Sequence, residues 1–393
     1  MDNAMRVVKR TGGAGRRTLG LCLSGGGARG AFQVGVYERL LRDPRFARGP
    51  VVLSGTSAGA INAALIAAGK SPADMMRFWE GIADDPPVVA SRLFFHSLIR
   101  TMLRLTAQEF GLWLVSPGLT VWPFLRRALN HMPLQRGSAL ALWVEYLLTA
   151  RFELVSKLLE GIREPYVADT ARLRERLIGE FGGEVVPHDG RRLAINTVDA
   201  HTGRVVRYVT AHTPLTRPPD YTVVEAITVD MIMASASIPL LFPSVEVDGR
   251  WLWDGGLLVN TPLAPVVALG ADEIVTVLVT EAPDVVSGPF PHFGRAVERT
   301  VDAILENAYN VDRKLLLDRN RLAHLESSSY REVTLYEAVR PKRDGRFNAG
   351  SYLYFERGVL ADMRAAGRRA AAAWLAAGPR VDRLEPTSAG EAA

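Results

Sequence analysis

The chain has 393 residues, of which 47 are Lys or Arg and 42 are Asp or Glu, giving a formal net charge of +5 at pH 7. This length allows a large buried core in one big domain or in two, and a hydrophobic content of 48% is typical of a globular protein. A single cysteine, Cys22, excludes a scaffold held by intrachain disulfides and indicates a reducing compartment.

The N-terminal residues 1–17 are basic and glycine-rich, and we expect them to form a flexible arm. They lack the apolar core of a secretory signal peptide. No run of eighteen apolar residues occurs in the chain, so no membrane-spanning helix is expected. These features predict a cytoplasmic or peripheral membrane location.

The first elements are predicted to be a strand at 18–24, a glycine-rich loop and a helix at 29–42. The loop reads Gly25-Gly26-Gly27-Ala28-Arg29-Gly30. Its glycines fit the G-x-G-x-x-G pattern of dinucleotide-binding domains, but that interpretation requires an acidic residue at the end of the second strand. The second strand ends at Ser54-Gly55 instead. What remains is a run of N–H groups at a helix N-terminus, which suits an anion, including the oxyanion of a tetrahedral intermediate.

The second strand and helix flank a serine. An apolar run at 51–53 precedes Gly55-Thr56-Ser57-Ala58-Gly59, and an alanine-rich helix is predicted at 58–68. Gly-x-Ser-x-Gly between a strand and a helix is the nucleophile elbow, a turn so tight that only small residues fit around the serine. A small-residue turn without chemistry is the alternative for this pentapeptide alone. The strand–helix–strand–helix order over 18–80 predicts parallel pairing, and hence an α/β sheet covered by helices.

Residues 82–190 are expected to form a helical insertion, and the window 88–137 within it is basic and aromatic. Its arginines are Arg92, Arg100, Arg104, Arg126, Arg127 and Arg136, and its aromatic residues include Phe94, Phe95, Trp113 and Trp122. Basic charge beside apolar residues at helical spacing is typical of an interfacial helix on an anionic membrane. No nucleic-acid-binding motif accompanies the arginines, so no nucleic-acid partner is expected. With a second apolar helix predicted at 138–160, the insertion is interpreted as a lid, a membrane anchor or a plain structural cap.

Two hairpins are predicted after the insertion, at 191–210 and at 245–253, the second with Asp248-Gly249 as its turn. A helix is predicted between them at 223–236. Asp254-Gly255-Gly256 follows the second hairpin directly, so a carboxylate lies where a strand gives way to flexible backbone. A turn aspartate without chemistry is the alternative for Asp254 taken singly.

The remainder of the chain is predicted to alternate helices and short strands. The elements are a helix and a strand within 263–279, a long helix at 295–320, a strand at 333–338 and a helix at 359–377. Residues 281–378 are interpreted as an extension packed on the core. The tail at 379–393 is expected to be disordered.

Taken together, these motifs resemble the patatin-like phospholipase family of lipid acyl hydrolases. The family's Gly-Gly-Gly-x-Arg/Lys-Gly loop, Gly-x-Ser-x-Gly elbow and Asp-Gly-Gly/Ala segment all occur here, in the family's order and without substitution. Residues 234–239 and 254–260 are similar to a further block of the family. The resemblance covers roughly residues 18–80 and 190–280.

The resemblance implies a three-layer α/β fold with a central, mainly parallel sheet flanked by helices. It implies a hydrolase domain over 18–280, interrupted by the insertion at 82–190. Carried onto this sequence, it makes Ser57 the nucleophile and Asp254 the proton acceptor of a catalytic dyad. The N–H groups around Gly25, Gly26 and Gly27 become the oxyanion hole, within the motifs Gly25–Gly30, Gly55–Gly59 and Asp254–Gly256.

The implied activity is hydrolysis of carboxylic esters in phospholipids or lysophospholipids, through an acyl-enzyme and with no metal or cofactor. An aspartate needs a raised pKa to serve as the base, and exclusion of water around Asp254 would raise it. A catalytically quiet lipid-binding or scaffolding protein on the same fold is one alternative. A Ser-His-Asp triad with His292 or His324 is another, but the α/β-hydrolase fold needs several strands before its elbow, and this chain has room for one.

Overall fold

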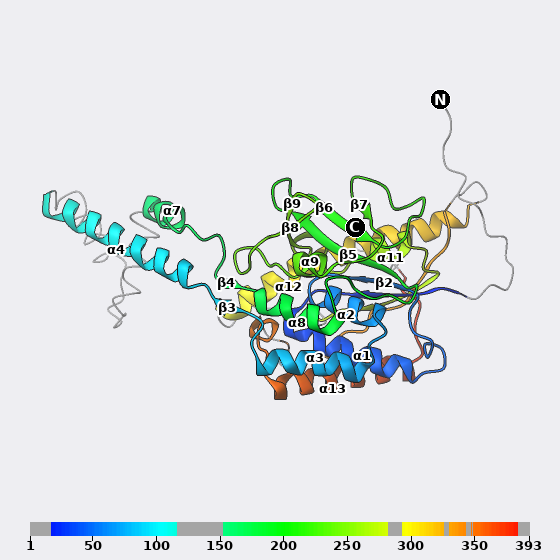
Figure 1. The fold of residues 1–393 in the computed structure, drawn as a ribbon. Coiled ribbons are helices and arrows are strands. Elements are labelled where there is room, and N and C mark those ends of the chain that lie inside the picture. Colours follow the sequence, from blue (N-terminus) through cyan, green and yellow to red (C-terminus); the bar gives the residue numbers. More distant parts are fainter. Residues whose placement is uncertain are drawn as a thin grey trace, which may run out of the picture. The chain divides into compact units, whose positions relative to one another are not determined.

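The computed structural model describes residues 17–115, 152–281, 293–325, 330–342, 347 and 349–383. The chain divides into two compact units (Figure 1). The first comprises Met1–Val88, Thr170–Pro239 and Ser244–Ala393, and the second comprises Val89–Asp169 and Leu240–Pro243. Residues 170–190, which the sequence interpretation placed in the insertion, thus belong to the first unit. Within the described ranges, no helix is long and apolar enough to cross a membrane.

A parallel sheet forms the centre of the first unit. Its strands, in spatial order, are β11 (Thr334–Leu335), β10 (Glu273–Val277), β1 (Leu19–Leu23), β2 (Val52–Gly55) and β5 (Arg192–Asp199). Each pairs in parallel with its neighbours. Nearly every residue of β1, β2 and β10 is buried, as expected for a parallel sheet with both faces covered. The predicted α/β class is confirmed.

Further strands extend the sheet around β5. They are β6 (Val205–Val209), β7 (Tyr221–Val223), β8 (Val245–Val247) and β9 (Arg250–Asp254). Strand β6 pairs antiparallel with one edge of β5, and β7 pairs in parallel with β6. Strand β9 pairs antiparallel with both β5 and β8. The turn between β8 and β9 has positive φ at Asp248 (51°) and Gly249 (73°), as a type I′ hairpin requires.

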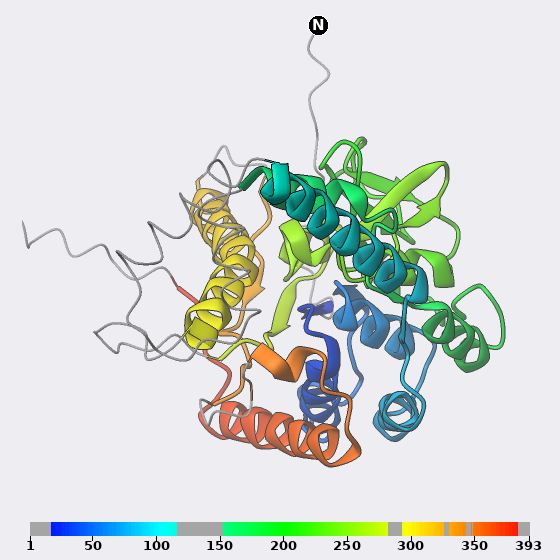
Figure 2. The ribbon, with the colours of Figure 1, turned by 90° about the vertical axis from the view of Figure 1, so that its left-hand side faces the viewer.

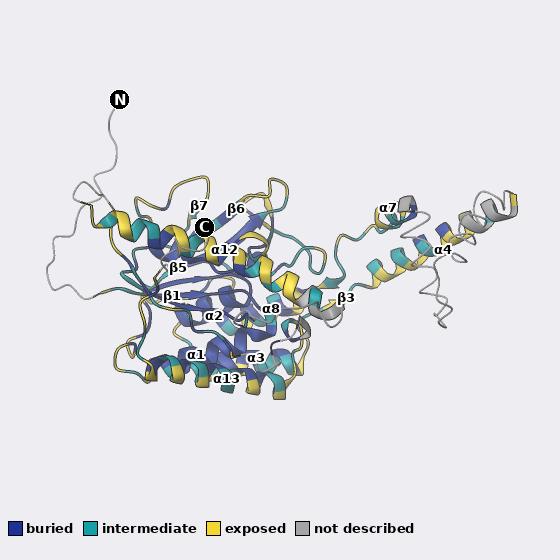
Figure 3. Cartoon of the chain, turned by 180° about the vertical axis from the view of Figure 1, so that it is seen from behind, coloured by how far each residue is buried: buried dark blue, intermediate teal, exposed yellow. Residues whose placement is uncertain are grey.

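Helices cover both faces of this sheet. One face carries α1 (Gly30–Leu41), α2 (Ala58–Ala67), α3 (Pro72–Asp84), α8 (Ala171–Phe181), α9 (Val229–Ser235) and α13 (Arg357–Ala376). The other carries α11 (Leu263–Ala268) and α12 (Phe293–Ala323). Alternation along β1 divides its side chains between the two cores, with Leu21 and Leu23 in the first and Cys22 in the second. Figure 3 shows the buried sheet and α2 between helices whose outer faces are exposed.

The boundaries of one predicted helix were wrong. The helix expected at 223–236 begins at Val229, because Val223 is paired in β7 and the backbone of Val224, Ile227 and Thr228 also pairs with other segments. The hydroxyl of Thr228 then caps α9 by accepting the N–H of Met231 (3.3 Å). The strand expected at 333–338 is likewise limited to β11.

The C-terminal helix α13 packs closely along α1 (Figures 1 and 2). A Cβ at Gly35 would lie 2.0 Å from the carbonyl of Arg364, and one at Gly367 would lie 2.1 Å from the carbonyl of Phe32. The guanidinium of Arg364 also pairs with the nearly buried Glu38 carboxylate at 2.9 Å. The glycines on both helices therefore allow the two backbones to approach each other closely.

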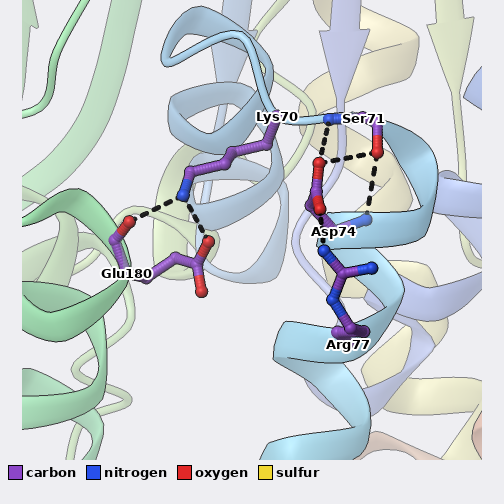
Figure 4. Close-up of polar contacts among 5 residues, drawn as sticks. All are labelled: Lys70, Ser71, Asp74, Arg77 and Glu180. Atoms are coloured by element: carbon purple, nitrogen blue, oxygen red, sulfur yellow. Dashed lines mark hydrogen bonds and ion pairs between the residues drawn. The ribbon is translucent and has the colours of Figure 1, made fainter.

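Polar contacts fix the turn between α2 and α3 (Figure 4). Ser71 and Asp74 form a capping box, in which each side chain accepts the other's backbone N–H. Arg77 pairs with the same Asp74 carboxylate. Lys70 reaches across to Glu180 at the end of α8, donating to its carbonyl (2.8 Å) and pairing with its carboxylate (2.7 Å). These contacts tie α2, the helix that follows Ser57, to its neighbours.

The second unit consists of a pair of helices and a short pair of strands. Its elements are β3 (Val89–Ala90), α4 (Arg92–Val115), α7 (Phe152–Gly161) and β4 (Ala168–Asp169). Leu105 and Leu154 form a small buried cluster between the helices, and the hydroxyl of Thr101 donates to the carbonyl of Gly161 at 2.9 Å. Phe94 and Phe95 stand edge to face on α4, with their ring centres 5.4 Å apart.

Some predicted features lie outside the described residues. They include the N-terminal arm up to residue 16, Trp122, the predicted helix up to residue 151, His292 and the tail from residue 384, together with Arg126, Arg127 and Arg136. Trp113 lies on α4, but its side chain is also outside what the structure describes.

Candidate active site

Ser57 lies at the turn between β2 and α2, and it is 7% exposed. Its φ of 55° is positive, a conformation that costs a non-glycine residue on the order of 1–3 kcal/mol. The turn is tight because a Cβ at Gly59 would lie 2.3 Å from the carbonyl of Leu23 at the end of β1. A strained serine between a buried strand and a helix is the geometry of a nucleophile elbow.

Strand register brings Asp254 to this serine. Strand β2 ends at Gly55, opposite Ile195 of β5. Asp254 pairs with Thr197, two residues further along β5. Because β6 occupies the opposite edge of β5 there, β9 lies on the same edge as β2, directly beyond its end. The last residue of β9 therefore meets the turn that follows β2.

The carboxylate of Asp254 is hydrogen-bonded within this buried corner. It accepts the hydroxyl of Ser57 and the N–H of Gly256 at 2.6 Å. Asp254 is 4% exposed, and desolvation raises its pKa from an ordinary 3.8 to about 7, while the two hydrogen bonds act in the opposite direction. The Ser57 hydroxyl is therefore hydrogen-bonded to a carboxylate, that of Asp254, which takes up a proton near neutral pH.

The glycine-rich loop packs directly against the serine. A Cβ at Gly25 would lie 3.1 Å from the Cβ of Ser57. The N–H of Gly25 donates to the carbonyl of Asn260 at 2.9 Å, so it is already occupied. Within the described part of the chain, no backbone carbonyl accepts the N–H of Gly26 or Gly27. These two donors, next to a serine at a helix N-terminus, can receive a developing negative charge.

Arg29 is fully buried and anchors the glycine-rich loop to the C-terminal part of the chain. Its guanidinium donates to the hydroxyl of Ser351 (2.9 Å) and to the carbonyls of Val279 (3.1 Å) and Phe347 (2.7 Å). It also stacks on the ring of Tyr352, with 3.6 Å between Cζ and the ring centre. These contacts give Arg29 a structural role behind the loop.

Two sets of polar residues around the site were not identified from the sequence. In the first, the N–H of Ser57 donates to the hydroxyl of Ser235 (3.0 Å), which donates to the carbonyl of Asn196 (2.6 Å). Ser235 lies in the family-like stretch at 234–239, which was the available signal. Ser235 thereby holds the backbone of the elbow against β5.

The second set joins the elements around the glycine-rich loop. Gln33 of α1 donates to the carbonyl of Ser24 (2.6 Å), Asn62 of α2 donates to Gln33 (2.8 Å), and Trp79 of α3 donates to Asn62 (2.9 Å). All four residues are buried. Gln33 and Asn62 stood as polar residues within apolar stretches of predicted helices, a pattern that indicates a buried hydrogen-bond network.

In the part of the chain that the structure describes, no histidine is hydrogen-bonded to Ser57 or Asp254. His188, His201, His212 and His324 are exposed, and His324 faces Glu332 at 3.7 Å. His292 lies outside the described residues. No described group of three His, Cys, Asp or Glu side chains is arranged to hold a metal ion.

A hydroxyl on a strained elbow, a buried carboxylate beside it and N–H donors in an adjacent loop are components that serine hydrolases use. A family model for patatin-like phospholipases matches residues 21–267, more than half of the chain. The chain belongs to the patatin-like phospholipase family, whose typical activity is lipid acyl hydrolysis.

Among solved structures, the chain is similar to VipD from Legionella pneumophila, with 16% identity and a TM-score of 0.34 over 89% of this chain and 67% of VipD. It is also similar to a chain of the heterodimeric ExoU–SpcU complex from the type III secretion system of Pseudomonas aeruginosa, with 17% identity and a TM-score of 0.26. That match covers 80% of this chain but only 56% of the other. No curated protein matches the chain.

Proposed function

We propose that this protein hydrolyses carboxylic ester bonds of membrane lipids, as a phospholipase A or a lysophospholipase. The observation that carries the proposal is the hydrogen bond from the Ser57 hydroxyl to Asp254, whose pKa is raised to about 7. A general base is most effective when its pKa lies near the working pH. Membership of the patatin-like family supports a lipid as the substrate class.

In the acylation step, the Ser57 oxygen attacks the ester carbonyl carbon while its proton passes to the Asp254 carboxylate. The carbonyl oxygen becomes an oxyanion, which the N–H groups of Gly26 and Gly27 stabilise. The tetrahedral intermediate then collapses. The C–O bond to the glycerol moiety breaks, and the leaving oxygen takes the proton from Asp254, so that an acyl-Ser57 ester remains.

In the deacylation step, water attacks the acyl-Ser57 carbonyl while Asp254 accepts a proton from it. Collapse of the second tetrahedral intermediate releases the fatty acid, and the Ser57 oxygen takes the proton back. Because Asp254 acts first as a base and then as an acid, a pKa near 7 serves both halves of each step.

Substitution of the dyad tests this proposal. Ser57→Ala should abolish labelling by a fluorophosphonate probe and reduce turnover on the order of 10⁴-fold or more, and Asp254→Asn should do nearly as much. Because the two side chains act as a unit, the double variant should be little worse than either single one. Mass spectrometry of the products formed from mixed lipid vesicles would identify the ester that is cleaved.

Each alternative predicts a different result in the same assays. Unlabelled, inactive wild-type protein would favour the lipid-binding scaffold. Substantial turnover by Asp254→Asn, together with loss of turnover in His292→Ala or His324→Ala, would favour the histidine triad. The two histidine variants are also the matched controls, because the dyad predicts wild-type turnover for both.

We also propose that α4 of the second unit contacts the anionic membrane that holds the substrate. Large apolar side chains on this helix are exposed to water, namely Leu93 (65%), Ile99 (55%) and Leu103 (67%). Arg100 and Arg104 are exposed on the same helix. Exposed apolar residues beside basic ones support contact with a lipid surface, and a solvated structural cap is the competing interpretation.

A further inference from the structure

A groove of about 760 Å³ lies between α12 and the short helix α10 (Gly256–Val259) of the first unit. Its apolar lining residues include Leu257, Leu258, Val259, Ala303, Ile304 and Val311. This volume is in the range of sites that enclose small organic ligands, about 300–1,000 Å³. None of the residues that line this groove takes part in the reaction steps proposed above.

The wall that α12 contributes is a continuous stripe along one side of the helix. It consists of adjacent pairs of residues that repeat every four positions from Arg299 to Asp312, which places its members on one face. The 13 residue-to-residue steps from Arg299 to Asp312 span about 20 Å of helix. That length exceeds the ~15 Å that a lipid chain occupies in one leaflet of a bilayer. The stripe is therefore long enough to lie along a long acyl chain.

The opposite wall is hydrogen-bonded to Asp254 of the dyad and to Thr56, the residue before Ser57. Val259 accepts the hydroxyl of Thr56, the neighbour of Ser57, at 2.8 Å. At the other end of α10, the N–H of Gly256 donates to Asp254. One short helix thus lines the groove and contacts both Asp254 and the neighbour of Ser57, so the groove adjoins the proposed site of ester cleavage.

The apolar side chains of the groove are exposed to water. Leu257 is 47% exposed, Leu258 44% and Ile304 57%. Removal of such surface from water is favourable by about 25 cal/mol per Å². A substrate whose ester lies at Ser57 brings a hydrocarbon chain to this region, and that chain can cover these side chains.

We infer that the groove between α10 and α12 binds the acyl chain of the substrate and selects for long chains. The inference rests on the proposed function, because it assigns the groove to the chain of the ester that Ser57 attacks. Contact with each additional methylene should raise kcat/KM by about fourfold until the groove is filled. A short-chain ester gains little from the groove.

A bulky residue in the groove tests the inference with p-nitrophenyl esters of increasing chain length. Ala303→Trp should lower kcat/KM for a long-chain ester at least tenfold and leave the acetate ester unchanged. Val301→Trp, on the same exposed helix but outside the groove lining, is the matched control and should retain the wild-type profile. Should Ala303→Trp fail to fold, as judged by circular dichroism, Ile304→Ser is expected to show the same selective loss.

A binding experiment separates this inference from the proposed function. In a Ser57→Ala background, binding of a fluorescent long-chain fatty acid should weaken at least tenfold on Ala303→Trp and stay unchanged on Val301→Trp. If the wild-type protein cleaves no ester but this binding pattern holds, the proposed function fails and the groove assignment stands. Equal profiles and equal binding for folded Ala303→Trp and Val301→Trp would overturn the inference.

Discussion

Asp254 has an environment that is unfavourable for an ionised carboxylate. It is 4% exposed, and among the residues that the structure describes only the Ser57 hydroxyl and the Gly256 N–H lower its pKa. Desolvation outweighs both hydrogen bonds and raises the pKa to about 7. The proposed base is therefore stabilised in its protonated form, which has consequences for activity and for stability.

The rate of ester hydrolysis should depend on the ionisation of Asp254. With an uncharged short-chain ester, kcat/KM should rise about tenfold per pH unit below the pKa and level off above about 7. Initial rates between pH 5 and 9 measure this profile. A profile that is flat over this range would contradict the assignment of Asp254 as the base.

The same carboxylate should destabilise the protein at alkaline pH. Because its pKa is higher in the folded chain than the ordinary 3.8, its contribution to stability is fully present below pH 3.8 and is lost as the pH rises through about 7. Asp254→Asn removes this loss, so it should raise the free energy of unfolding at pH 8.5 by up to about 4 kcal/mol and change it little at pH 4.

Urea unfolding at the two pH values measures this difference. Asp248→Asn is the matched control, since it makes the same chemical change at an exposed turn residue, where asparagine tolerates the positive φ. An Asp254→Asn variant that loses stability equally at both pH values would show that ionisation is not the cause.

At the scale of elements, the glycine-rich loop depends on a segment far along the chain. The side chain of Arg29 donates hydrogen bonds to the carbonyl of Phe347 and the hydroxyl of Ser351. The φ of Gly27 is 53°, and a Cβ at this position would lie 2.0 Å from the carbonyl of Tyr352. The family match ends at residue 267. The predicted C-terminal extension thus supplies contacts behind the candidate oxyanion hole.

Arg29→Lys should therefore impair catalysis through loop position. Lysine keeps the charge but cannot reach all three acceptors in one plane, so we expect kcat to fall by one to two orders of magnitude with KM little changed. Because some of these buried hydrogen bonds to the charged group are lost, the free energy of unfolding should also fall by about 3 kcal/mol. Ser351→Ala, which removes one hydrogen bond, should cost only about 1 kcal/mol. Wild-type kcat in Arg29→Lys, measured beside thermal unfolding, would refute this role.

At the scale of the whole molecule, activity on membranes should require the second unit as well as the dyad. Each arginine near an anionic surface contributes about 1 kcal/mol, so reversing Arg100 and Arg104 to glutamate should lower binding to anionic vesicles by about 30-fold or more. Hydrolysis of vesicle lipid should fall with binding, while hydrolysis of a soluble short-chain ester should not. Higher salt should weaken wild-type binding.

Arg48→Glu with Arg369→Glu is the matched control, because both residues are exposed in the first unit. Each double reversal removes two positive charges and adds two negative ones, so both variants change the formal net charge from +5 to +1. Equal loss of vesicle binding in the two variants would mean that net charge alone is responsible. Equal loss of turnover on vesicles and on the soluble ester would support the structural cap.

The sequence alone determined the features that depend on a few neighbouring residues. The elbow around Ser57, the glycine-rich loop and the Asp248-Gly249 turn are local, because small or turn-forming residues must occupy adjacent positions for the backbone to adopt these shapes. The alternation of strands and helices likewise predicted the α/β class. The late start of α9 was missed because long-range backbone pairing of residues between Val223 and Thr228 competes with helix formation.

Only the tertiary structure decided which residues that are distant in the sequence come into contact. Asp254 reaches Ser57 because β2 and β9 share one edge of β5, a register that no local pattern encodes. Its raised pKa depends on burial by many residues at once. The hydrogen-bond partners named for Arg29 lie 250 or more residues away, and the groove beside α10 exists only because α12 packs against it. Burial and long-range pairing are properties of the folded chain, since they depend on which surfaces exclude water together.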